Sequence, residues 1–265
     1  MRDANSLSEQ LKTSRLDEVL ADVLSQVKAK PDNLMLRNTL FRLYCIEGEW
    51  EKALMQLQTI ALLDDAAQKQ CELYKNLVFS ELIREEVLTG ARSPGLLEEN
   101  FPEWMSLTQQ ANRAHMQNEH QRAETLRQKA FQLAPESAGG GRITGDFAWI
   151  ADSDGRIGPA CEFISAGGYR QVPFASLQLL HVKRPGDLLD LVWAPAHIQA
   201  GGQFYYGYVP SRYPLSANAA QSEKLGWRSE WQEVSASLST GAGRKVLITD
   251  SGEFSLLEIT EISFA

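Results

Sequence analysis

Apolar residues in the first half of the chain recur at the spacing of amphipathic helices. One stripe runs through residues 34–47, at positions i, i+4, i+5 and i+8: Leu36, Leu40, Phe41 and Tyr44. Residues 103–116 carry a second stripe of the same kind, and residues 66–90 read as one long helix that ends at Gly90. The pattern predicts an array of helices up to residue 136.

Three stretches of this half resemble one another: 14–31, 48–65 and 118–135. Each opens on a small or turn-forming residue, has a compact residue at its sixth place and ends on Pro or Asp. The first two are offset by 34 residues, which is the tetratricopeptide period. Because one helical hairpin cannot bury its apolar face alone, such hairpins stack and leave a groove. We therefore expect a tetratricopeptide-like helical domain over residues 1–136.

From residue 137 onward the period is that of short strands separated by Gly or Pro. Only 215–227 reads as a helix there, and the connections are too short for strand–helix alternation, which favours an antiparallel sheet over a doubly wound fold. We expect an α+β domain over residues 137–265, after a glycine-rich hinge at 136–142. The expected strands are 147–151, 156–164, 170–174, 177–183, 190–198, 203–209, 229–235, 244–250 and 254–262.

Composition narrows the class of protein. The 265 residues are 43% hydrophobic and carry a net charge of −8, which allows two cores and gives no basic face for nucleic acid. No leader-type apolar segment or membrane-length apolar run occurs, so we expect a cytoplasmic protein. The three widely spaced cysteines, Cys45, Cys71 and Cys161, are expected to be buried thiols.

The stretch WIADSDG at residues 149–155 places two acidic residues two apart, before a glycine. In a calcium loop counted from Asp152, the fifth ligand position would be Arg156, a cation where an oxygen is needed. The chain also holds a second stretch of the same kind, ITDSGEF at residues 248–254. Asp, Ser and Gly are turn chemistry, so a hairpin turn is favoured over a metal site.

Other catalytic templates are missing from the sequence. It contains no nucleophile elbow and no phosphate-binding loop, and its four histidines lack metal-ligand spacing: His115, His120, His181 and His197. We expect a protein that is not an enzyme and needs no metal or cofactor. The less favoured alternative is a metal-dependent hydrolase centred on Asp152, Asp154 and His197.

Several stretches resemble the ImpE family, also called TagJ or SciE, an accessory component of bacterial type VI secretion systems. The most diagnostic is the combination of W-I-A-D-x-D-x-R-[LI]-G-P with L-V-W-A-P-A-H. The matching stretches keep the family's order over nearly the whole chain: 37–57, 147–164, 172–177, 187–198, 209–214 and 246–259. The chain departs from the family pattern after Pro214, where Leu215-Ser216-Ala217 replaces an acidic, glycine-containing continuation.

The resemblance implies a tetratricopeptide-like helical domain followed by an ImpE-type α+β domain. It also implies a non-enzymatic cytoplasmic adaptor with two partners. One is the small sheath subunit, which is bound through a short N-terminal helix. The other is the AAA+ ATPase that recycles contracted sheath, and this ATPase is reached through the sheath subunit. An adaptor of tetratricopeptide type for an unrelated client is the alternative that the repeats alone leave open.

A groove in a helical array is suited to an amphipathic helix, and binding hot spots in such grooves are usually aromatic residues or Arg. Tyr206, Arg212 and Tyr213 flank Gly and Pro turns and are expected to be exposed, whereas Phe41 and Trp50 sit at packing positions. The candidate partner-binding residues are Tyr44, Tyr74, Trp193, His197, Tyr206, Arg212 and Tyr213.

Overall fold

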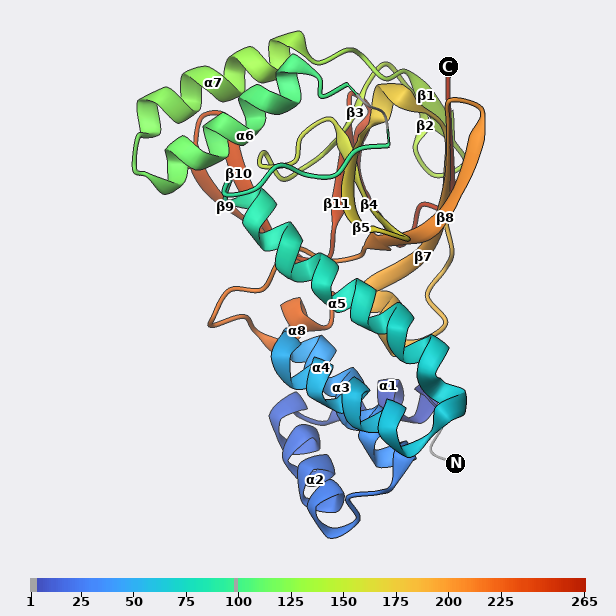
Figure 1. Cartoon of the computed structure of the whole chain (residues 1–265). Helices are drawn as coiled ribbons and strands as arrows, with labels where there is room; N and C mark the ends of the chain where they lie inside the picture. Colours follow the sequence, from blue (N-terminus) through green and yellow to red (C-terminus); the bar gives the residue numbers. More distant parts are fainter. Residues whose placement is uncertain (1–3, 98–99) are drawn as a thin grey trace.

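The computed structural model describes residues 4–97 and 100–265. Figure 1 shows α1 to α4 stacked at one end, α5 crossing the molecule diagonally, and the α6–α7 hairpin beside the strands at the other end. A one-turn 3₁₀ helix, η1 (Asp65–Ala67), precedes α5. The helices of the first half are α1 (Ala4–Thr13), α2 (Leu16–Ala29), α3 (Leu34–Glu47), α4 (Trp50–Leu63), α5 (Gln68–Leu88), α6 (Glu103–Met116) and α7 (His120–Leu133).

The helices predicted from apolar periodicity are confirmed, and α1 is an addition. Local caps explain two of the boundaries. The Asn33 side chain accepts a hydrogen bond from the amide of Leu36 at the start of α3, and Gly90 adopts a left-handed φ of 73° just after α5. None of the helices in the described ranges combines the length and apolar character needed to cross a lipid bilayer.

The second half is built on antiparallel strands, as predicted. Its largest sheet has the strand order β2-β1-β13-β6-β7-β8-β4-β5. These strands are β1 (Gly139–Gly141), β2 (Gly145–Phe147), β4 (Ala160–Ser165), β5 (Gly168–Pro173), β6 (Leu177–Val182), β7 (Trp193–Ala200), β8 (Gln203–Pro210) and β13 (Glu261–Phe264).

Two smaller sheets complete this half. One has the order β12-β11-β3, and the other is the β9–β10 hairpin. Their strands are β3 (Ile150–Asp152), β9 (Ser229–Ser235), β10 (Leu238–Gly243), β11 (Val246–Thr249) and β12 (Gly252–Ser255). The short helical elements are η2 (Phe174–Ser176), η3 (Leu188–Leu191) and α8 (Gln221–Lys224).

Several secondary-structure predictions for this half are wrong. The helix expected over 215–227 is only the single turn of α8, and the strand expected over 254–262 is two strands separated by a turn. The glycines expected to form a hinge are strand β1, paired with β2 and β13. A Cβ on Gly141 would lie 2.4 Å from the carbonyl oxygen of Glu261, so the glycines there permit close strand approach.

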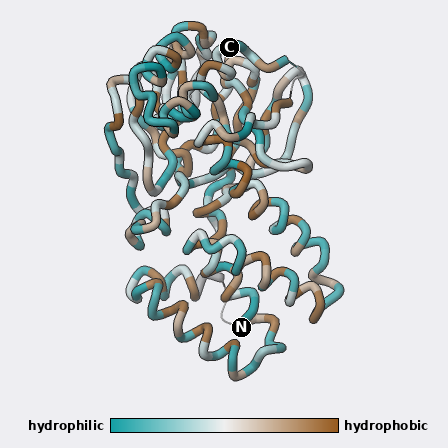
Figure 2. The backbone as a smooth tube through the Cα atoms, turned by 60° about the vertical axis from the view of Figure 1, so that its left-hand side comes forward, coloured by the Kyte–Doolittle hydropathy of each residue, from teal (hydrophilic) through white to brown (hydrophobic). Residues whose placement is uncertain are grey.

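The two halves share buried apolar packing. The core of the helical end continues into the second half through Tyr169, Leu189 and Trp193, while a second core lies under the large sheet around Phe163 and Ile198. Figure 2 shows hydrophobic segments where the lower helices join the upper strands. The predicted domain boundary at residue 136 falls between α7 and β1 and stays a prediction.

Candidate functional site

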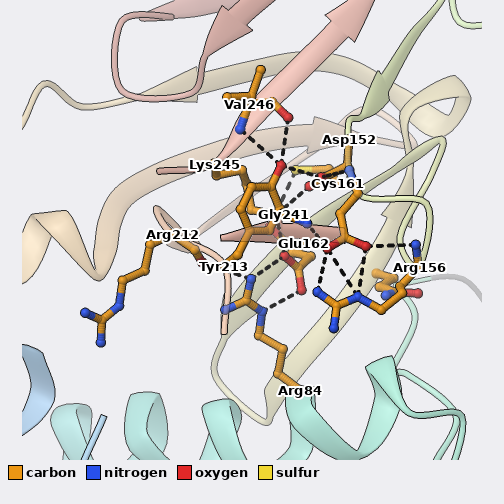
Figure 3. Close-up of polar contacts among 12 residues, drawn as sticks. Arg84, Asp152, Arg156, Cys161, Glu162, Arg212, Tyr213, Gly241, Lys245 and Val246 are labelled. Atoms are coloured by element: carbon orange, nitrogen blue, oxygen red, sulfur yellow. Dashed lines mark hydrogen bonds and ion pairs between the residues drawn. The ribbon is translucent and has the colours of Figure 1, made fainter. Parts of the chain in front are cut away.

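Charged side chains from distant parts of the chain meet in the interior, where α5 lies against the strands (Figure 3). Arg84 extends inward from α5 and Glu162 from β4, and Lys245 is the residue directly before β11. We call this set the buried charge network: Glu81, Arg84, Asp152, Asp154, Arg156, Glu162 and Lys245. Apart from Arg156, their side chains are at most 4% exposed.

The network is closed by short hydrogen bonds. The Arg84 guanidinium donates from Nε and Nη2 to the two oxygens of Glu162, at 2.7 and 2.8 Å, and from Nη1 to Glu81 at 3.1 Å. Lys245 Nζ lies 2.6 Å from Glu162 Oε2 and also donates to Asp152. Tyr169 donates its hydroxyl to Glu162 at 2.6 Å. Such a bidentate, fully partnered arrangement is what buried charges need.

Burial and pairing set the protonation of the two central carboxyls. Burial alone would raise the pKa of Glu162, but Arg84 and Lys245 lower it well below its usual range. Burial raises the pKa of Asp152 to about 6, against the attraction of Lys245 and with support from the nearby charge of Glu162. These groups are buried and mutually paired, and their ion pairs hold α5 to the strands.

The acidic stretch is not the hairpin turn that the sequence predicts. Strands β3 and β4 on either side of it belong to different sheets. Instead, the stretch folds around its own carboxylates. Asp152 accepts from the amide of Asp154 at 2.9 Å, and Asp154 accepts from the amide of Arg156 at 2.9 Å and that of Gly241 at 3.0 Å. The Arg156 guanidinium also pairs with Asp154.

The second stretch of this kind does form a hairpin, between β11 and β12, where Thr249 pairs with Gly252. The two similar stretches are also neighbours in space. Strand β3 pairs antiparallel with β11, with Asp152 opposite Leu247 and Ile150 opposite Thr249. The strands that lead into the two stretches are therefore neighbours in one small sheet.

The residues of the alternative hydrolase site are not assembled. His197 lies on β7, with its ring stacked 4.6 Å from His181 and 5.5 Å from Tyr206, while Asp152 and Asp154 are engaged by Lys245 and Arg156. Across residues 4–97 and 100–265, no three His, Cys, Asp or Glu side chains are grouped so as to hold a metal ion. Each of the three cysteines, all within these ranges, is a buried free thiol, as predicted.

Four of the candidate partner-binding residues are internal, and one of them, Tyr44, is buried in the helical core. Trp193 is 1% exposed and donates its indole N–H to Glu81 at 2.8 Å. The expectation that Arg212 and Tyr213 are exposed is wrong, because the loop after β8 pairs its backbone with Val192 and Gly243 and runs through the interior. The Tyr213 hydroxyl donates to Asp152 at 2.9 Å.

Arg212 joins the two halves. Figure 3 shows its side chain pointing away from the network toward the N-terminal helices. Its guanidinium donates to the carbonyl oxygens of Cys45 and Ile46, both at 2.7 Å, and also to the backbone carbonyl oxygen of Lys224. These first two carbonyls belong to the last turn of α3, where a cation also complements the helix dipole. Burial lowers the pKa of Arg212 to about 10, so it remains a cation at neutral pH.

The other three candidates, Tyr74, His197 and Tyr206, lie nearer the surface. Tyr206 is 74% exposed, and His197 beside it is partly exposed. Tyr74 is half-buried, with its ring 5.0 Å from that of Phe41. Tyr74 lines a groove of about 220 Å³ between α3, α4 and α5, together with Leu34, Asn38, Leu57, Ile60, Asp64, Ala66, Ala67, Gln70 and Cys71. We call it the array groove.

A large cleft contains none of the candidate partner-binding residues. It has a volume of about 780 Å³ and lies between α7, the β12-β11-β3 sheet and the β9–β10 hairpin. Two tryptophans that sequence reasoning passed over, Trp149 and Trp231, line it. The signal for Trp231 was present in the alternation of residues 229–235, which places it and Glu233 on one face of a strand.

These observations define a two-part α and β protein whose halves are joined by buried ion pairs and whose open clefts suit binding. The ImpE protein family model matches residues 144–263. The type VI secretion system accessory component TagJ of Pseudomonas aeruginosa is 34% identical over 259 residues, which cover 97% of this chain and 90% of that protein. The chain therefore belongs to the ImpE/TagJ family, and the resemblance found in its sequence is confirmed.

A solved structure has the same fold. The crystal structure of protein VPA1032 from Vibrio parahaemolyticus superposes with a TM-score of 0.88, covering 97% of each chain. The two sequences are 22% identical, so this likeness concerns the fold alone.

Proposed function

We propose that this protein is a non-enzymatic adaptor of a type VI secretion system and that it acts in the cytoplasm. The observation that carries the proposal is the 34% identity to an accessory component of such a system, which extends over 97% of the chain. A binding role also agrees with the chemistry of the interior, where the charged groups of the buried charge network form ion pairs with one another.

The proposed ligand of the helical half is an N-terminal helix of the small sheath subunit. Helices α2 to α7 act in this proposal as a tetratricopeptide-like array, and the array groove receives the apolar face of the helix. Tyr74 lines this groove, and apolar side chains remain exposed on the surrounding helices: Met35 at 47%, Leu63 at 43% and Leu73 at 39%. The AAA+ sheath-recycling ATPase is reached through the sheath subunit.

A peptide titration tests this proposal. The peptide is the first helix of the small sheath subunit, titrated against the wild-type protein, Tyr74→Ala and the control Trp227→Ala, whose residue is exposed and lies outside the array groove. We expect wild-type binding tighter than about 100 μM and at least about fivefold weaker binding by Tyr74→Ala, the loss of one hot-spot contact.

Two outcomes would count against the proposal. Absence of wild-type binding at about 100 μM would argue against the sheath helix as ligand. A pull-down from the native cell that recovers neither sheath nor ATPase would favour an adaptor for an unrelated client.

A further inference from the structure

The cleft between α7 and the β9–β10 hairpin gathers aromatic side chains that the fold leaves partly uncovered. Phe131 projects from α7, Trp149 precedes β3, and Trp231 stands on β9. Their exposed fractions are 36%, 38% and 37%. Single exposed apolar residues are ordinary on a protein surface, but several that line one cavity mark a binding site.

The rim of the same cleft is acidic. Glu136, Glu233 and Glu253 line it and are exposed, and none of the described residues that line it is a Lys or Arg. Near its floor, the Ser153 hydroxyl oxygen is buried and has no hydrogen-bond partner among the described residues. We call this site the acidic cleft. Its carboxylates and tryptophan faces both attract cations, and its uncovered rings suit an apolar side chain.

The walls of the acidic cleft are fixed before any ligand arrives. Glu124 on α7 accepts hydrogen bonds from the hydroxyls of Ser235 and Ser237 at 2.6 and 2.8 Å, which ties the β9–β10 hairpin to the helix. The Trp231 ring packs edge-on against Tyr213, with centroids 5.5 Å apart, and Tyr213 is anchored to Asp152. A site with ordered walls loses less entropy on binding than a flexible one.

We propose that the acidic cleft binds a cationic segment of a partner protein, in which an aromatic or aliphatic side chain stands beside Lys or Arg. The apolar side chain enters between Trp149 and Trp231, and the cations meet the carboxylate rim. The acidic cleft and the array groove share no lining residue, so this second binding surface does not depend on the sheath helix.

A charged probe peptide tests the proposal. The probe is a short fluorescent peptide of alternating Lys and Leu, and its counterpart has Glu in place of Lys. Anisotropy with the wild-type protein is expected to show binding of the Lys peptide only. Trp231→Ala is expected to weaken binding about tenfold, and so is a triple Glu→Gln variant of the rim, Glu136, Glu233 and Glu253.

Matched controls separate the cleft from the net charge of −8. Trp227→Ala removes a tryptophan that is 43% exposed and outside the cleft. A second triple Glu→Gln variant changes the same charge at exposed positions elsewhere: Glu51, Glu72 and Glu261. Both controls are expected to bind as the wild type does.

Each remaining outcome overturns the proposal. Equal weakening by the two triple variants would mean general attraction to an acidic protein. Binding of the Glu peptide would remove the need for cations, and no binding of the Lys peptide would remove the site. Because Trp231 also packs on Tyr213, Trp149→Ala provides a second test that avoids that contact. Its failure to weaken binding would equally contradict the proposal.

Discussion

Arg84 is the residue on which the junction between the halves depends most. Its side chain is 1% exposed and bonds to Glu162, Glu81 and the backbone carbonyl of Arg212. A buried ion pair is costly to desolvate, so its partners are stable there only while all of them are present. The burial of Arg84 therefore makes it a position where truncation leaves uncompensated charge.

Replacement of Arg84 is expected to destabilise the folded protein. Arg84→Met leaves Glu162 and Glu81 buried without their main partner, so the free energy of unfolding is expected to fall by about 3–5 kcal/mol. Arg92→Met is the control, because its ion pair with Glu86 is more than half exposed on both sides and is worth less than about 1 kcal/mol. Urea unfolding of the three proteins measures both effects. Similar losses in the two variants would contradict this account.

The raised pKa of Asp152 gives a prediction about pH. A carboxyl with a pKa near 6 in the folded protein, against 3.8 ordinarily, binds its proton more tightly when folded. Its contribution to stability is complete below about pH 3.8 and is lost as the pH rises through about 6. Relative to Asp152→Asn, the wild type is therefore expected to gain roughly 1 kcal/mol of stability between about pH 7 and pH 5.

Denaturant titrations of both proteins across this range measure the difference. Glu162 does not mask it. Although burial opposes ionisation, Arg84 and Lys245 lower its pKa, so its contribution is present above its ordinary pKa of 4.5 and is lost only at lower pH. A stability difference that is constant from about pH 7 to pH 5 would contradict the prediction.

Sequence reasoning found part of this network and could not find the rest. It singled out Asp152 and Asp154, and it noticed that Arg156 is a cation where a calcium ligand would be needed. That cation is the partner of Asp154. Arg84 and Lys245 lie 78 and 83 residues from Glu162 in the chain (162 − 84 and 245 − 162). Only the tertiary fold brings them together, so no local spacing could reveal them.

Among the secondary-structure elements, the helices could be predicted from the sequence more closely than the strands. A helix such as α3 is indicated by its local periodicity and its caps. Its predicted bounds, 34–47, agree with the structure. Strand pairing depends on distant partners. The alternation around residues 147–164 gave β3 and β4 but could not tell that they enter different sheets. Strand β1, three glycines long, has no side chains and hence no pattern at all.

The close packing of β1 leaves no room for a side chain at Gly141. Gly141→Ala places a methyl group 2.4 Å from the carbonyl oxygen of Glu261, so the strands must separate, at a cost of about 1–3 kcal/mol. Gly186→Ala is the control, because the nearest atom to its added methyl would be 4.0 Å away. Thermal unfolding compares the two variants. If Gly141→Ala were as stable as Gly186→Ala, residues 139–141 would behave as the linker that the sequence suggested.

At the scale of the whole molecule, the halves are joined by both polar and apolar contacts. Arg212 holds the end of α3, the buried charge network holds α5, and one apolar core runs through the junction. A change in composition near residue 137 suggested two separable parts. It could not indicate how much surface they bury against each other, because that depends on side chains from both.

The shared core predicts that the two halves unfold together. Trp50 and Trp104 report on the helical half, and four other tryptophans report on the strands. Urea transitions followed by tryptophan fluorescence and by far-ultraviolet circular dichroism are expected to have the same midpoint. Two separated transitions would mean that the junction contributes too little to couple the halves.

The locked orientation of α5 has a consequence for how the protein could bridge other molecules. A flexible tether lets two bound ligands sample many separations, but a stiff connection allows only one. Ligands seated in the array groove and in the acidic cleft would be held at a set span and angle. The protein would then join only those sites on a larger assembly whose spacing matches the distance between the array groove and the acidic cleft.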